Sequence, residues 1–174
     1  VFCNHVLTPA AMEHILLTVP QRPDAPKLNG LVGPAHVSTV IGSNPYRHFS
    51  EKWKMPVVVC GFEPLDMLLS ILMLIRQVNE GRAEVENEFT RAVTAEGNVK
   101  AIELMDEVFE RRPTFEWRGL GTVPNSALRI RPEFAEFDAE KRFVMPELVV
   151  PDNKACECGA ILRGEKQPSD CRAF

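Results

Sequence analysis

The sequence predicts an α/β fold, and one segment carries most of that prediction. Pro56–Cys60 is a continuous β-branched run, typical of a strand buried on both faces of a parallel sheet. Gly61–Glu63 then forms a tight turn, and Pro64–Glu80 has a helical pattern with Gly81 as its terminating residue. Strand, turn and helix in this order are half of a βαβ unit. Because the helix is apolar nearly all round, we expect it to be buried between layers.

The other elements follow from proline positions and apolar periodicity. A capping residue followed by proline occurs at Thr8-Pro9 and at Asn44-Pro45, and each pair indicates a helix start. The elements expected elsewhere are a strand tail over 1–3, helices over 9–18, 45–53, 98–110 and 132–138, a short strand over 28–32, a strand or extended edge over 84–93, and short strands with turns over 115–130.

The chain divides into two parts at a proline-marked linker. We expect residues 1–145 to be α/β core lobes, parallel-sheet lobes with flanking helices that are incomplete at the N-terminus. Pro146 and Pro151 mark the linker, and residues 146–174 begin a small Cys-rich domain that is also incomplete. The chain starts at Val1 without a methionine, so we interpret it as an internal piece of a longer protein.

Composition excludes several classes of protein. The 174 residues are 45% hydrophobic and 25% charged, which is typical of a globular domain. The net charge of −4 argues against a nucleic-acid partner. The longest strongly apolar run is Met67–Ile75, whereas a membrane span needs about 20 residues, so we expect no membrane segment.

Three of the five cysteines lie close to the end of the chain, at Cys156, Cys158 and Cys171. Thiolates are soft ligands that suit zinc or an iron–sulfur cluster. An odd number of cysteines with this clustering favours a reducing compartment and a metal site over a disulfide framework. The alternative is a set of unpaired thiols near a frayed end. With one residue between them, Cys156 and Cys158 are less suited to joint ligation than to the use of one.

Two turns after predicted strands carry candidate site residues. Glu63 and Asp66 follow the strand over 56–60, and His36 follows the strand over 28–32, where open α/β sheets place their ligands. Each has a structural alternative. Acidic residues in a first helical turn stabilise the helix dipole by a few tenths of a kcal/mol, and a lone histidine is more often structural than functional.

Several of these segments together resemble the HypD family of hydrogenase formation proteins. The segments keep the family's order and spacing over essentially the whole chain: Phe2-Cys3-Asn4-His5 with Thr8-Pro9, Gly33–Ser38 with Ile41-Gly42, Gly61–Asp66, Val85-Glu86-Asn87, Glu116–Gly121, Phe137-Asp138-Ala139, and Cys158-Gly159 through Cys171. Family members favour glycine at the position of Ala35, so we expect mild backbone strain at this turn.

The resemblance implies a cytoplasmic scaffold for nickel–iron hydrogenase maturation. It implies that the protein works with the chaperone HypC and the cyanide donor HypE. These proteins would assemble an iron that transiently carries cyanide and CO. The hydrogenase large subunit is then an indirect partner. His36, Glu63 and Asp66 are then the catalytic-site residues that line the cleft beside this iron.

The resemblance also implies a 4Fe-4S cluster that supplies electrons. Cys158 and Cys171 match the first two of four cluster ligands, and Cys156 stands outside the ligand set. The other two ligands are expected beyond Phe174, and the family's redox-active thiol pair before Val1.

Two rival interpretations belong to other functional classes. The first is a small-molecule α/β enzyme that uses the turn over Gly61–Asp66 and holds a structural zinc on its C-terminal cysteines. The second is an interaction module whose cysteines bind no metal. Zinc without acid-labile sulfide would favour the first, and Cys→Ala variants that keep metal content and hydrogenase activity would favour the second.

Overall fold

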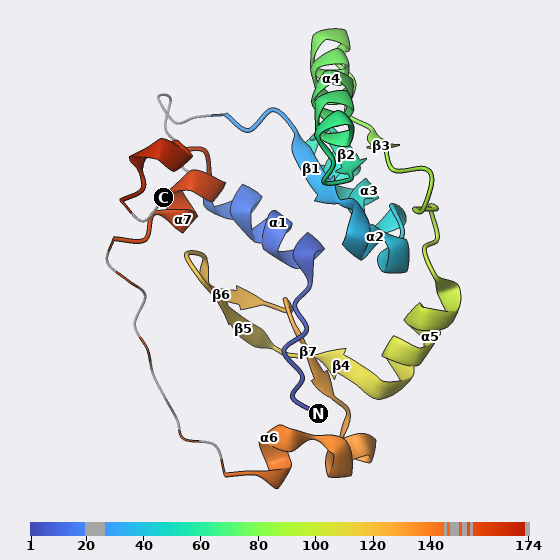
Figure 1. Cartoon of the computed structure of the whole chain (residues 1–174), viewed down its shortest axis with the longest axis vertical. Helices are drawn as coiled ribbons and strands as arrows, with labels where there is room; N and C mark the ends of the chain where they lie inside the picture. Colours follow the sequence, from blue (N-terminus) through green and yellow to red (C-terminus); the bar gives the residue numbers. More distant parts are fainter. Residues whose placement is uncertain (20–26, 145, 147–149, 151–152, 154, 173–174) are drawn as a thin grey trace. The chain divides into compact units, whose positions relative to one another are not determined.

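The computed structural model describes residues 1–19, 27–144, 146, 150, 153 and 155–172 (Figure 1). The chain forms two compact units. One unit is Leu28–Met105, and the other combines Val1–Lys27 with Asp106–Phe174. The chain mixes helices with parallel and antiparallel strands, which confirms the α/β class. The boundary predicted between residues 145 and 146 was placed at a proline-marked linker, not between compact units. It stays a prediction.

The unit over 28–105 is built on a three-stranded parallel sheet in the order β1-β2-β3. Its elements are β1 (Leu31–Pro34), α2 (Ala35–Ile41), the 3-10 helix η1 (Asn44–Tyr46), α3 (Arg47–Trp53), β2 (Val57–Cys60), α4 (Pro64–Glu80), β3 (Val85–Asn87) and the first part of α5 (Val99–Val108). Val57 is in register with Leu31 on one side and with Val85 on the other. The predicted strand-turn-helix unit is therefore confirmed.

The core of this unit surrounds the central strand. Val57, Val58 and Val59 of β2 are fully buried, as expected of a β-branched strand that is covered on both faces. Tyr46 and Phe49, from η1 and α3, are buried as well. The apolar surface removed from water around β2 is the main source of stability in this unit.

The prediction that α4 is buried between layers is wrong. The helix packs against β2 through a narrow stripe that contains Asp66, Ser70 and Gln77, its three buried residues. Most of its large apolar side chains are exposed: Leu65, Met67, Leu68, Leu69, Ile71, Leu72, Ile75 and Val78. The sequence pattern was interpreted as apolar nearly all round, although Asp66, Ser70 and Gln77 recur at helical spacing on one face. Here the polar stripe faces inward and the widest apolar face points to solvent.

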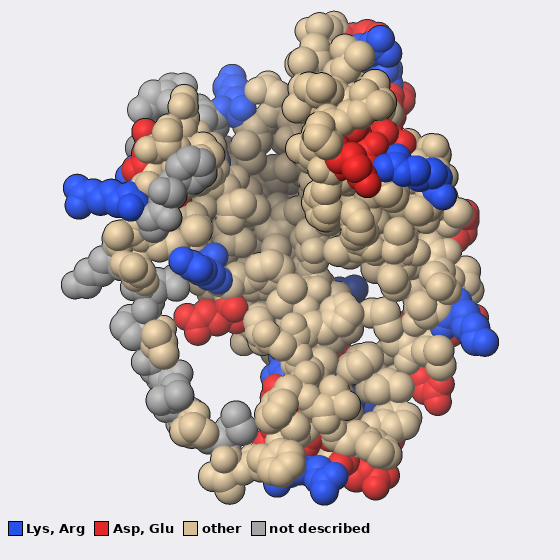
Figure 2. Space-filling view, in the orientation of Figure 1, with Lys and Arg blue, Asp and Glu red and all other residues tan. Residues whose placement is uncertain are grey.

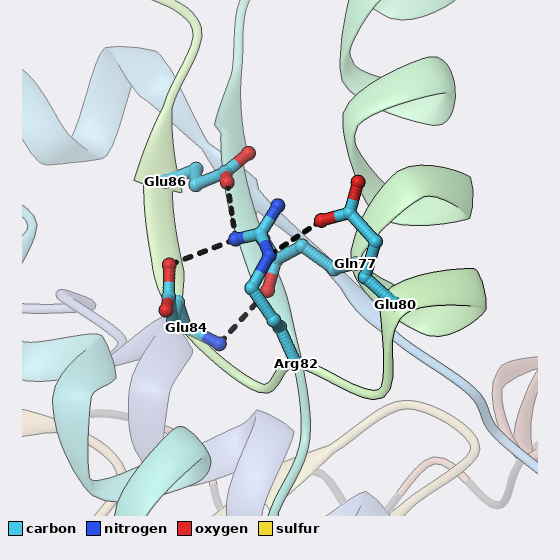
Figure 3. A network of polar contacts seen from close by, with 5 residues as sticks. All are labelled: Gln77, Glu80, Arg82, Glu84 and Glu86. Carbon is cyan, nitrogen blue, oxygen red and sulfur yellow. Dashed lines mark hydrogen bonds and ion pairs between the residues drawn. The ribbon is translucent and has the colours of Figure 1, made fainter.

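A polar network fixes the end of α4, as Figure 3 shows. The helix ends at Gly81 with a φ of 67°, in the left-handed region that glycine adopts easily. The side-chain oxygen of Gln77 accepts the Glu84 N–H at 2.8 Å. Arg82 then pairs with three carboxylates: Glu80 at 2.7 Å, Glu84 at 2.8 Å and Glu86 at 3.0 Å. These hydrogen bonds, that of Glu80 first, raise the pKa of the Arg82 guanidinium above its ordinary value.

The second unit contains two short antiparallel strand pairs, β4-β7 and β5-β6. Its elements are α1 (Thr8–Thr18), β4 (Phe109–Arg111), β5 (Thr114–Trp117), β6 (Gly121–Pro124), β7 (Leu128–Ile130), the 3-10 helix η2 (Pro132–Phe137), α6 (Ala139–Arg142), α7 (Cys158–Leu162) and the 3-10 helix η3 (Pro168–Asp170). The short strands predicted over 115–130 are confirmed. Part of the proline-marked linker, including Pro151, lies outside the described residues.

Several local predictions differ from the structure. Asn44 is the first residue of a 3-10 helix instead of a cap, and the α-helix after it begins at Arg47. Residues 1–3 form no strand. Shortly after them, Val6 makes one isolated bridge with Ala127. The helix start at Thr8 has Leu7 as its N-cap without a side-chain hydrogen bond, so Thr8 is the first helical residue instead of the cap. Ala35 begins α2 and has no positive φ, so the strain expected there is absent. Among the described helices, none has both the length and the apolarity to cross a bilayer.

Candidate functional site at the carboxyl edge of the parallel sheet

The carboxyl ends of the three parallel strands bring the predicted site residues together within one unit. His36 is the second residue of α2, directly after β1, and Glu63 is the N-cap of α4, just after β2. Asp66 lies in the first turn of α4. The segment after β3 adds Phe89 and Arg91, which the sequence had not singled out. Parallel strands end on the same side of a sheet, so residues far apart in the chain meet there.

An aromatic contact holds the ring of His36. The imidazole stacks on Phe62, with ring centroids 4.7 Å apart and planes 6° from parallel. The ring of Phe89 lies 5.8 Å away on a tilted plane. Among the described residues, neither ring nitrogen of His36 has a hydrogen-bond partner, and the residue is exposed. The stack therefore restricts the ring plane while both nitrogens stay available to a ligand or a proton.

Asp66 belongs to an ion pair that joins two strand ends. Its carboxylate accepts a hydrogen bond from Nη2 of Arg91 at 2.6 Å, and the same nitrogen lies 3.3 Å from Glu63. The hydrogen bond from the Arg91 guanidinium, followed by local interaction with Glu63, holds the pKa of Asp66 below its usual range. Asp66 is 5% exposed, whereas the side chain of Glu63 is 60% exposed. The two carboxylates thus differ: one is fixed and paired, and the other is open to solvent.

Phe89 is the platform that supports both sides of this site. Its ring is buried, and the guanidinium carbon of Arg91 lies 3.7 Å from the ring centroid. Gly61 makes this packing feasible, because a Cβ there would come within 2.6 Å of the Phe89 ring and would collide with Asp66. The glycine after β2 is therefore required by close approach, not by its backbone angles.

The other unit gathers the C-terminal thiols. Cys156 and Cys158 are joined by hydrogen bonds, and the backbone N–H and side chain of Cys158, then Arg118, lower the pKa of Cys156. The Cys156 side chain in turn raises the pKa of Cys158, and charge on Cys171 raises it further. The three thiols are all partly exposed and free. They form one electrostatically coupled group beside the loop that carries Arg118.

Two glycines bring the Arg118 loop against the first turn of α7. A Cβ on Gly119 would lie 2.8 Å from the backbone nitrogen of Gly159 and 2.9 Å from Cβ of Cys158. A Cβ on Gly159 would collide with the Gly119 carbonyl oxygen. Gly119 has a φ of 75°, which other residues rarely adopt. Backbone therefore packs on backbone here, and this contact positions Cys158.

The side chains of this thiol group are of the type that binds iron–sulfur clusters. Soft thiolates are their usual ligands, and a cluster takes four of them. Within the residues that the structure describes, no three His, Cys, Asp or Glu side chains are arranged around a common point for a metal ion.

Comparison with known proteins relates both groups of residues to one family. The HypD sequence profile, described as "Hydrogenase formation hypA family", matches residues 1–174. The chain belongs to the HypD family. It is 63% identical over 174 residues to the hydrogenase expression/formation protein HupD of Azotobacter chroococcum mcd 1, and 63% identical over 175 residues to the hydrogenase maturation factor HypD of Cupriavidus necator. A putative hydrogenase expression/formation protein of Methanocaldococcus jannaschii is 42% identical over 170 residues.

The chain spans less than half of these HypD relatives. The alignments cover 100% of this chain but 46% of the relative in the two closer matches, and 98% and 46% in the archaeal one. The predicted family resemblance is confirmed. The particular roles of His36, Glu63, Asp66, Cys158 and Cys171 stay predictions.

Sequence reasoning missed the contribution of the third strand. Phe89 and Arg91 lie in a segment that was expected to be a strand or an extended edge, and β3 occupies only Val85–Asn87 of it. The sequence did carry a usable signal. An arginine follows one strand end closely, and two acidic residues follow the end of a neighbouring strand, which places opposite charges at the same edge of the sheet. In the other unit, Arg118 was included only within the segment Glu116–Gly121 that carries the family resemblance.

Proposed function

We propose that this chain is part of a nickel–iron hydrogenase maturation scaffold, and that the carboxyl edge of its parallel sheet faces the iron under assembly. The observation that carries the proposal is the state of His36. Its ring is held by Phe62, and its nitrogens have no partner among the described residues. Neutral imidazole is a common ligand for iron and an effective proton carrier near neutral pH. A stacked ring whose nitrogens have no partner among the described residues suits either role.

The two carboxylates take different roles in this proposal. Asp66 and Arg91 position each other, and the pair keeps the turn after β2 beside the segment after β3. Glu63 is exposed and only weakly engaged by Arg91 at 3.3 Å, so it is free to attract a cation or to contact the incoming iron. Together the two acids and the arginine leave one net negative charge, which favours approach of an iron cation.

The thiol group supports a second part of the proposal. Cys158 and Cys171 would supply two of the thiolates of a 4Fe-4S cluster, and a bound cluster would supply electrons for cyanide ligation. Cys156 stays outside the ligand set, where Arg118 and the Cys158 N–H stabilise its thiolate. The backbone contact between Gly119 and Gly159 keeps Cys158 beside the Arg118 loop.

The proposed partners follow from the family assignment. We place the protein in the cytoplasm, where HypC would hold the iron jointly with it and HypE would donate cyanide. The hydrogenase large subunit would receive the finished Fe(CN)2CO centre. These roles belong to the longer protein, since this chain spans 46% of its relatives.

The test uses the full-length gene that contains this segment, expressed in a strain that lacks its own HypD. His36→Ala is compared with His14→Ala, a matched histidine change in the other unit on α1. We expect His36→Ala to abolish hydrogenase activity and the infrared bands of iron-bound cyanide in the purified HypC complex. His14→Ala should leave both unchanged. Normal cyanide bands in folded His36→Ala protein would refute the role of this edge.

Metal analysis of the same full-length preparation tests the cluster. The proposal predicts iron with acid-labile sulfide, and loss of both after Cys158→Ala or Cys171→Ala. Zinc without sulfide would support the small-molecule enzyme with a structural zinc. Unchanged metal content and unchanged hydrogenase activity in both variants would support the interaction module.

A further inference from the structure

The outward face of α4 is unusual for a helix of an α/β unit. Four of its residues, Leu65, Leu68, Leu72 and Ile75, are between 43% and 66% exposed. On a helix with about 100° between residues, these four lie opposite Ser70, which is fully buried toward the sheet. On the face shown in Figure 2, residues other than Lys, Arg, Asp and Glu cover most of this helix. The exposed stripe is thus a continuous apolar surface.

The spacing along the stripe indicates what kind of element it fits. The four residues, Leu65, Leu68, Leu72 and Ile75, follow one another at intervals of three, four and three residues. Alternating intervals of three and four produce the seam along which two helices pack side by side. Scattered exposed apolar residues are common on protein surfaces, but a regular seam of leucine and isoleucine is not. The chemistry of this surface therefore fits a second apolar helix.

The size of the seam restricts the source of that helix. With 17 residues, α4 is about 25 Å long, and a helical contact about 10 Å wide covers a few hundred Å². A stable complex of two separate chains normally buries about 800 Å² on each partner. The seam by itself offers less area than a stable interface between two separate chains normally buries. A helix of the same polypeptide needs less area, because its translational freedom is already restricted.

The relatives provide such a polypeptide. Their chains are more than twice as long as this one, which covers 46% of each. We propose that the Leu65–Leu68–Leu72–Ile75 seam of α4 is an intramolecular docking surface, and that its occupant is a helix from the part of the family's longer chain that these 174 residues do not include. The seam then joins the unit over 28–105 to the rest of the scaffold.

The test compares chemical accessibility in two lengths of the protein. Leu72→Cys is made in the 174-residue chain and in the full-length protein, and modification by a maleimide is followed by peptide mass spectrometry, which distinguishes the new thiol from the native ones. Leu104→Cys on α5 is the matched control, because Leu104 is an exposed leucine on a helix of the same unit. Circular dichroism checks that each variant folds, and Leu68→Cys replaces Leu72→Cys if it does not.

The expected result is a difference that depends on length at one position only. In the 174-residue chain the two new thiols should react at similar rates. In the full-length protein Leu72→Cys should react at least about tenfold more slowly, because modification then requires local opening, whereas Leu104→Cys should be unchanged.

Four results would overturn the proposal. Equal rates at Leu72→Cys in both lengths would mean that no other segment covers the seam. Slow modification in the 174-residue chain that depends on protein concentration would identify a second copy as the occupant. Slow modification there at every concentration would mean that these 174 residues cover the seam themselves. Protection of the full-length protein only after another protein is added would identify a separate partner.

Discussion

Gly61→Ala should destabilise the unit over 28–105, whereas Gly33→Ala should not. Both glycines lie at the carboxyl ends of neighbouring strands, and neither has a positive φ, so alanine is acceptable to the backbone at both. The difference lies in the space around them. A Cβ at Gly61 would lie 2.6 Å from the Phe89 ring and would collide with Asp66, whereas a Cβ at Gly33 finds its nearest atom at 3.5 Å.

The size of the effect follows from those distances. Ordinary contact begins at 3.4 Å, so the Phe89 ring must retreat by about 0.8 Å and the Asp66 carboxylate by more. Phe89 is buried and Asp66 is fixed by Arg91 at 2.6 Å, so neither can move freely. Forcing an extra methyl group into a packed site costs about 1–3 kcal/mol. We expect about 2 kcal/mol for Gly61→Ala and less than about 0.5 kcal/mol for Gly33→Ala.

Urea unfolding followed by tryptophan fluorescence measures both variants. The chain has two tryptophans, Trp53 in the unit over 28–105 and Trp117 in the other unit, so a Trp117→Phe background reports on the first unit alone. A loss of 2 kcal/mol corresponds to a midpoint lower by about 1 M urea. Equal midpoints for Gly61→Ala and the parent would refute the close packing of Gly61, and an equally large loss for Gly33→Ala would refute the explanation by distance.

Three further predictions address the ion pair, the thiol group and the core. Arg91→Met should lower the free energy of unfolding above about pH 5. The difference from wild type should shrink as the pH falls below about 4, the ordinary pKa of a carboxyl group, towards the lower pKa of folded Asp66, since a depressed folded pKa gives its full stabilisation above the unfolded value and loses it as the pH falls through the folded value. A difference that stays constant down to pH 3 in the same urea assay would contradict the pairing. Arg118→Gln should slow alkylation of Cys156 at pH 7 by a few-fold, because the side chain that helps to lower its pKa is gone. An unchanged rate by peptide mass spectrometry would remove Arg118 from the thiol group. Val58→Ala should cost about 2 kcal/mol in the urea assay because a fully buried side chain loses two carbons, and a loss below about 0.5 kcal/mol would place Val58 outside the core.

The sequence predicted the parts of the site that depend on local pattern. A β-branched run followed by Gly61 and a proline-started helix has few other conformations, so β2, its turn and α4 were predicted correctly. The side of the sheet on which His36 and Asp66 meet followed from the parallel arrangement of the strands. Arg91 was missed because its role depends on β3 lying next to β2, and strand order is not a local property.

The orientation of α4 was predicted wrongly for a different physical reason. Apolar residues outnumber polar ones on the helix, so its pattern was interpreted as apolar nearly all round and burial on all sides was expected. The face that meets the sheet is marked instead by Ser70 and Gln77, two polar residues that would ordinarily be assigned to solvent. Gln77 is suited to its place because its side-chain oxygen satisfies the backbone of Glu84.

The polar network at the end of α4 also sets the rotation of the helix about its own axis. A turn of one residue, about 100°, would replace Ser70 by Ile71 against the sheet at little hydrophobic cost. Gln77 and Arg82 oppose that turn, since Gln77 is bonded to Glu84 just before β3, and Arg82 pairs with Glu80 of the helix and with Glu86 of β3. The leucine seam is therefore presented in one orientation before anything docks on it. Such pre-organisation shortens the conformational search during folding and reduces the entropy lost on docking.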